Sequence, residues 1–95
     1  MPVEAPETDV LVEETPETRI HTPWRVILYD DDIHTFEDVI VQLMKAVGCS
    51  ARQGYKHALT VHTTGKDTVF EGEFEECFRV QGVLREIQLV TEIEG

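Results

Sequence analysis

Two consecutive helices with clear start and stop signals limit the folds open to this chain. Thr35 is followed three residues later by Asp38, a box-like pattern that caps a helix N-terminus, and Gly48 is placed to end that helix. A second box, Ser50–Gln53, begins another helix that Gly65 ends. The short link between them predicts a helical pair early in the fold.

Apolar side chains recur along both helices at intervals of three and four residues, the spacing of one helix face. In the first helix they are Phe36, Val39, Ile40, Leu43, Met44 and Val47. In the second, the stripe consists of Tyr55, Ala58, Leu59 and His62. Each helix is therefore expected to pack one face against the rest of the domain.

Strands are predicted on both sides of the helical pair. Residues 24–29 are rich in β-branched and aromatic side chains, and shorter strands are expected over 67–71 and 89–93. A third helix is predicted over 73–86, with Phe74, Cys77, Phe78 and Leu84 facing inward. The order β-α-α-β-α-β predicts a single α+β domain, a three-stranded antiparallel sheet covered on one face by three helices.

The N-terminal segment differs in composition from the rest of the chain. Residues 1–23 contain six acidic residues, one arginine and four prolines, which predicts a disordered acidic arm preceding a folded domain over residues 24–95. The whole chain of 95 residues has a net charge of −11, which argues against nucleic acid as a partner. We expect no membrane span and, because the two cysteines fit no metal or disulfide spacing, a cytoplasmic protein.

Three consecutive aspartates, Asp30–Asp32, follow the first predicted strand. Adjacent carboxylates repel one another and add little to a strand, so a positive ligand is the natural reason to hold them together. If His62 lies beside them, the site can bind a metal ion, a Lys or Arg side chain, or an α-ammonium group.

Two other kinds of functional site use residues of these types. A transition-metal site could use Asp30, Asp32, His34 and His62, whose residue types are suitable ligands. A hydrolase needs an activated nucleophile, and the only candidate, Cys49, follows a glycine that more simply ends a helix. We therefore expect a protein that is not an enzyme and that has no cofactor and no resident metal.

The first strand, the aspartate triplet and the later His62-Thr-Thr-Gly-Lys66 motif together resemble the ClpS family. Members of that family are adaptors that hand N-degron substrates to the Clp ATPase–protease. The resemblance covers residues 24–95 and implies a pocket that grips the free N-terminal residue of a protein. It also implies two partners, the N-terminal domain of a Clp AAA+ ATPase and proteins that begin with a large hydrophobic residue.

The resemblance assigns roles to particular residues. Asp30, Asp31 and His62 match the positions that bind the α-ammonium group. The side-chain pocket is expected to be lined by Leu28, His34, Phe36, Val39, Ala58 and Val61. Glu73 and Arg79 correspond to the region that docks on the ATPase.

Three departures from the family pattern concern the pocket. Asp30 stands where the family commonly has Asn, Ala58 where it has Met, and His34-Thr35 where it has Thr-Pro. A carboxylate only accepts hydrogen bonds, whereas an amide also donates. An alternative remains open, in which a ClpS-like protein docks on the ATPase and regulates it without binding N-degrons.

Overall fold

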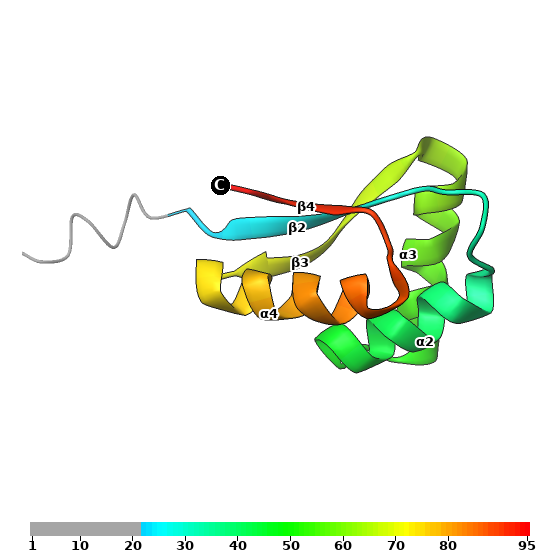
Figure 1. Ribbon diagram of the computed structural model, residues 1–95, viewed down its shortest axis with the longest axis horizontal. Helices are drawn as coiled ribbons and strands as arrows, with labels where there is room; N and C mark the ends of the chain where they lie inside the picture. Colours follow the sequence, from blue (N-terminus) through cyan, green and yellow to red (C-terminus); the bar gives the residue numbers. More distant parts are fainter. Residues whose placement is uncertain (1–21) are drawn as a thin grey trace, which may run out of the picture.

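The computed structural model describes residues 22–95 (Figure 1). Its elements, in chain order, are β2 (Trp24–Tyr29), α2 (Phe36–Val47), α3 (Ala51–Thr64), β3 (Lys66–Gly72), α4 (Phe74–Leu84), the 3-10 helix η1 (Arg85–Ile87) and β4 (Thr91–Glu94). This order confirms the predicted α+β class. All but the last two residues of the predicted N-terminal arm lie outside the described residues.

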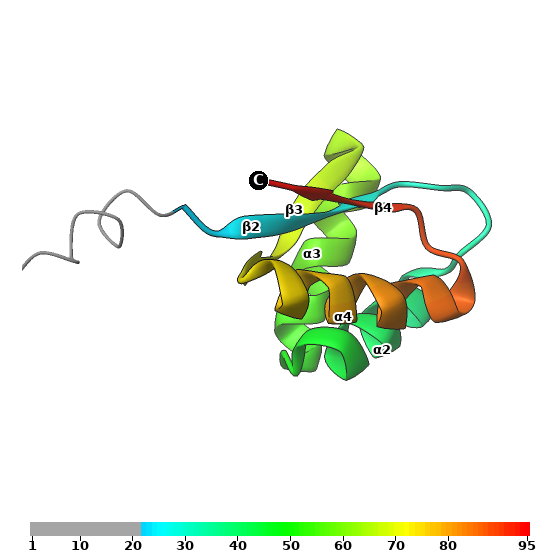
Figure 2. The same cartoon turned by 60° about the vertical axis from the view of Figure 1, so that its left-hand side comes forward.

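The sheet has β2 in its centre, paired antiparallel with β3 on one side and β4 on the other. Val26 and Leu28 of β2 are 0% and 1% exposed, because the helices gather on one side of the sheet and cover them (Figures 1 and 2). The predicted three-stranded antiparallel sheet, covered on one face, is confirmed.

The hydrophobic core lies between this face of the sheet and the helices. Its buried members are Val26, Leu28, Leu43, Ala46, Val61, Val69, Cys77, Val80, Leu84 and Leu89. Burying a large apolar side chain stabilises a fold by roughly 1.5–3 kcal/mol.

No helix within residues 22–95 is long and apolar enough to cross a membrane.

Both predicted capping boxes are formed. The Thr35 hydroxyl accepts a hydrogen bond from the backbone N–H of Asp38 at 3.0 Å, and that of Ser50 accepts one from Gln53 at 3.1 Å. In each case the side chain at the third helical position bonds back to the N–H of the capping residue. Each helix ends at a glycine in the left-handed conformation, which residues without a side chain adopt at no steric cost.

The two capped helices pack closely because Gly54 of α3 has no side chain. A Cβ atom at this position would lie 3.1 Å from Cγ2 of Ile40 in α2, which is tighter than an ordinary van der Waals contact. The separation of α2 from α3 therefore depends on Gly54.

The prediction that two aromatic residues of α4 face inward is wrong. Phe74 and Phe78 are 45% and 64% exposed. The buried stripe of α4 contains Cys77, Val80 and Leu84, which follow one another at intervals of three and four residues. Phe78 comes one residue after Cys77, so it projects about 100° away from that stripe around the helix.

Two predicted boundaries are each wrong by two residues. The third helix ends at Leu84 rather than Glu86, and the last strand begins at Thr91 rather than Leu89. The chain tightens into η1 and then turns at Gln88, which has a φ of 65° in the left-handed region. This turn carries the backbone from the helices to the sheet before strand pairing begins.

Candidate functional site

The loop that follows β2, residues 30–35, begins at a junction of three elements. The N–H of Tyr29 donates to the carbonyl of Val90 at 3.0 Å, and the N–H of Asp30 donates to the carbonyl of Gly65 at 2.9 Å. The end of β2 is thus tied both to the segment before β4 and to the C-terminus of α3. We call residues 30–35 the acidic loop.

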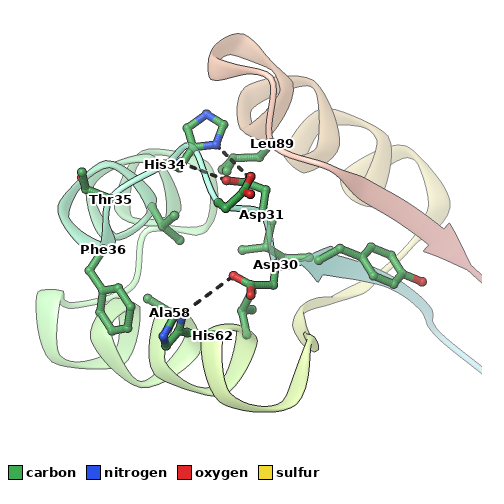
Figure 3. Close-up of a pocket in the computed structure, with 13 residues that line it drawn as sticks. Asp30, Asp31, His34, Thr35, Phe36, Ala58, His62 and Leu89 are labelled. Atoms are coloured by element: carbon green, nitrogen blue, oxygen red, sulfur yellow. Dashed lines mark hydrogen bonds and ion pairs between the residues drawn. The ribbon is translucent and has the colours of Figure 1, made fainter.

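Asp30 and His62 face each other across this junction (Figure 3). Oδ1 of Asp30 lies 4.0 Å from Nδ1 of His62, and the two side chains are 39% and 64% exposed. A carboxylate accepts hydrogen bonds, as does the unprotonated nitrogen of a neutral imidazole. The pair therefore offers acceptors to a ligand that approaches from solvent.

The carboxylate of Asp31 is bound mainly by its own loop. Oδ1 accepts from the N–H groups of Ile33 and His34, both at 2.9 Å, and Oδ2 lies 2.8 Å from Nδ1 of His34. Burial acts to raise the pKa of Asp31, but these hydrogen bonds outweigh it and the pKa is lowered. With three of about four acceptor positions filled, Asp31 has about one left for a ligand.

His34 connects the acidic loop to η1. Its Nδ1 contacts Asp31, and its Nε2 lies 2.5 Å from the carbonyl oxygen of Ile87. The hydrogen bond with Asp31 raises the pKa of His34 against the opposing effect of burial. The ring was predicted to line the side-chain pocket, and its residue does border the cavity described next.

A cavity of about 370 Å³ opens beside the Asp30–His62 pair. All nine residues that the sequence assigned to the ammonium site and the side-chain pocket border it. Its apolar walls come from three elements, with Leu28 on β2, Val39 on α2, and Ala58 and Val61 on α3. The cavity thus has polar side chains at its opening, which we call its mouth, and apolar side chains in its interior.

Four further residues border the cavity. Tyr29, Asp32 and Thr35 adjoin residues already assigned, so their nearness in sequence was a usable signal, and Asp32 also belongs to the aspartate triplet. Leu89 comes from the segment before β4 and is 3% exposed. No sequence motif marks Leu89, because its position depends on the pairing of β4 with β2.

The four residues of the alternative transition-metal site are not arranged as a set of metal ligands. Within residues 22–95, no group of three His, Cys, Asp or Glu side chains is placed to hold a metal ion. His34, one of the four proposed ligands, has both ring nitrogens directed at other partners, Asp31 and the carbonyl of Ile87.

Of the two residues assigned to ATPase docking, Glu73 immediately precedes α4 and Arg79 lies on it, and neither borders the cavity. Glu73 is the N-cap residue of α4, and the start of α4 lies at the opposite end of the described domain from the loop between β2 and α2 (Figure 1). Arg79 reaches α2, because its Nη1 donates to the carbonyl of Ala46 at 3.1 Å. Its Nη2 lies 3.4 Å from Oε1 of Glu76 on α4 itself.

Comparison with known families identifies residues 19–88 as a match to the family model described as ATP-dependent Clp protease adaptor protein ClpS. The ATP-dependent Clp protease adapter protein ClpS of Corynebacterium aurimucosum is 26% identical over 88 residues, covering 93% of this chain and 77% of the relative. The resemblance stated from the sequence motifs is thereby confirmed.

Human E3 ubiquitin-protein ligase UBR2 is 36% identical over 58 residues, which are 61% of this chain. The matched segment is only 3% of the ligase, so the likeness concerns one small region of a much larger protein. Among solved structures, that of Agrobacterium tumefaciens ClpS2 bound to L-phenylalaninamide matches with a TM-score of 0.66 and 23% identity, covering 77% of this chain and 98% of that one. At this identity the likeness shows a shared fold.

Proposed function

The chain belongs to the ClpS family of Clp protease adaptors, a family without catalytic activity, and on this basis we propose that its cavity binds the first residue of N-degron substrates. The chain then delivers these substrates to a Clp AAA+ ATPase–protease. One observation carries the proposal: the exposed Asp30–His62 pair borders an apolar cavity.

The polar mouth suits an α-ammonium group. Such a group has a reference pKa of about 7.7–8.0, so it is mostly charged at neutral pH, and it offers three hydrogen-bond donors. Asp30, a neutral His62 and the remaining acceptor position of Asp31 together supply three acceptors. A unit charge 4 Å from a carboxylate gains about 4 kcal/mol at an effective dielectric constant near 20, before desolvation is subtracted.

The cavity suits one large apolar side chain. Its volume of about 370 Å³ lies near the lower end of ligand pockets, which range over roughly 300–1,000 Å³. Burying a Leu or Phe side chain there would contribute roughly 1.5–3 kcal/mol. Because each end of the site contributes only part of the affinity, tight binding requires a hydrophobic residue that is also the first residue of a chain.

The ligand of the Agrobacterium relative has the same two chemical parts. L-phenylalaninamide carries a free α-ammonium group and an aromatic side chain, and its carboxamide resembles the start of a peptide. A ligand of this class fits the charge and polarity of the cavity in this chain.

Delivery requires a surface other than the cavity. We propose that Glu73 and Arg79 on α4 contact the N-terminal domain of the ATPase, so that substrate and ATPase are bound at separate places. This arrangement leaves the mouth of the cavity free while the adaptor is docked. We also propose a cytoplasmic location, which is general in the ClpS family.

The test is a series of fluorescent peptides that differ only in their first residue. Peptides beginning with Leu or Phe are expected to bind, and acetylation of their amino group should abolish binding. His62→Ala should weaken binding more than tenfold. The matched control is His57→Ala, because His57 also lies on α3 beside an aspartate, Asp67 at 2.6 Å, but does not border the cavity.

Equal affinity for free and acetylated peptides would contradict the proposal. A chain that binds no peptide of the series but binds the ATPase would instead be the regulator considered above.

A further inference from the structure

Both ring nitrogens of His34 face groups that can only accept hydrogen bonds. Nδ1 is 2.8 Å from Oδ2 of the Asp31 carboxylate, and Nε2 is 2.5 Å from the carbonyl oxygen of Ile87. A neutral imidazole has one N–H, so it could satisfy only one of these acceptors and would direct a lone pair at the other. An imidazolium donates to both.

We propose that His34 is an imidazolium at neutral pH and a positioning residue of the binding site, because it holds the acidic loop against η1. This inference rests on the proposed function only for its consequence in binding. The protonation state itself follows from the two contacts and can be tested without any ligand.

The charged surroundings of His34 favour the imidazolium. Asp31 contacts it directly, and Glu37 and Asp38 of α2 border a second hollow that His34 also lines. Glu86 of η1 is engaged by Lys45 at 2.8 Å, and His62 of α3 stands across the main cavity. The raised pKa of His34 agrees with this excess of negative charge.

The contacts of His34 join two parts of the cavity wall. The acidic loop borders the cavity, and so does Leu89, two residues after Ile87. Figure 3 shows His34, Asp31 and Leu89 together on one side, across from Ala58 and His62. When the ring loses a proton, one of its two bonds becomes a repulsive contact, so this side of the cavity is no longer held closed.

The charge of His34 also gives Asp30 and Asp31 different roles in the proposed site. An imidazolium against Asp31 leaves that pair close to neutral, whereas Asp30 is 39% exposed and has no such partner at hydrogen-bond distance among the described residues. Asp30 is thus the principal counter-charge for the α-ammonium, and Asp31 with His34 sets its surroundings.

The direct test is an NMR titration of the full chain, labelled with ¹⁵N in its histidine rings. At pH 7 the two ring nitrogens of His34 should have nearly equal shifts, the signature of an imidazolium. They should diverge only as the pH rises. Asp31→Asn, which removes the negative partner, should move this transition to lower pH. His57 is the internal control, because its one contact with an aspartate can be met by a neutral ring.

Binding provides a second readout. His34→Gln, which has no charge, should weaken binding of a Phe peptide roughly tenfold at pH 7, as expected for one lost charge-assisted hydrogen bond. His34→Arg keeps a non-titrating charge with several donors, so it should recover part of this loss. Its affinity should decline at alkaline pH only through the ammonium of the peptide, whereas wild type should decline more steeply. His57→Gln should bind as wild type does.

Unequal ring-nitrogen shifts for His34 at pH 7 would overturn the inference, as would wild-type affinity in His34→Gln. If no peptide binds to any variant, the proposed function fails, while the NMR titration still decides the charge of His34.

Discussion

The rings of Phe36 and His62 meet edge to face, with centroids 5.4 Å apart and planes at 71°. Phe36 lies at the start of α2 and His62 near the end of α3, so the contact spans the two helices that border the cavity. Tyr55 adds a third ring, 5.9 Å from that of Phe36. Phe36 therefore both forms part of the cavity wall and fixes the ring proposed to accept from the ligand.

Phe36→Ala should weaken binding of Leu and Phe peptides roughly tenfold, because an apolar wall and the support of His62 are lost together. Titration with fluorescent peptides measures the effect. Phe78→Ala is the control, since Phe78 is an exposed aromatic on α4 that does not border the cavity. Unaltered affinity in Phe36→Ala would show that the ring lies outside the ligand's path.

Ala58→Met should narrow the range of first residues that bind. Ala58 is 3% exposed and borders the cavity, so a longer side chain must occupy space near the ligand. In wild type, Ile and Val should bind within roughly tenfold of Leu, because each methylene contact is worth about 0.8 kcal/mol. The substitution should depress binding of Ile and Val peptides while sparing Leu and Phe. If wild type already rejects Ile and Val a hundredfold, a neighbour such as Phe36 supplies the restriction.

Peptide binding should weaken as the pH falls from about 7.5 to 5, the range in which histidines commonly gain a proton. Protonation removes the acceptor nitrogen of His62 and adds a positive charge next to the ammonium. Affinities measured across this range should be compared with those of His62→Gln, whose profile should be flatter. A flat wild-type profile would remove His62 as an acceptor.

The Asp31–His34 pair should stabilise the fold within a limited pH window. The lowered pKa of Asp31 gives a contribution that is present above its unfolded value of about 3.9 and lost as pH falls through the folded value. The raised pKa of His34 gives one that is fully present below about 6.5 and lost as pH rises through the folded value. In urea unfolding, His34→Gln should therefore cost roughly 1 kcal/mol near pH 6 and less at alkaline pH. An equal cost at both pH values would point to lost packing alone.

Removal of residues 1–23 should leave peptide affinity unchanged and slow the degradation of a degron-tagged protein by the ATPase–protease. The composition of the arm and the family resemblance motivate this expectation. Binding and degradation should be measured on the same preparation. Equal degradation rates with and without the arm would leave it only a solubilising role.

The helical pair was predictable because its signals are local. Capping boxes and terminal glycines act within a few residues, and both helices begin and end where those signals stand. The inward face of α4 was not predictable from hydrophobicity alone, since Phe74 and Phe78 are as apolar as the residues that are buried.

The nine predicted cavity residues could be named because they follow motifs of one family. The bridge from His34 to Ile87 joins residues 53 positions apart through a backbone carbonyl. A carbonyl oxygen is present at every residue, so no sequence pattern marks this contact.

Gly54 makes the packing of α2 against α3 sensitive to a single methyl group. Because a Cβ atom there would lie 3.1 Å from Cγ2 of Ile40, either the Ile40 side chain or α2 itself would have to give by a few tenths of an ångström. Val39 and Ala58, on those two helices, both border the cavity, so any shift of α2 against α3 would reach its walls. The shape of the cavity is therefore open to change through a residue that does not border it.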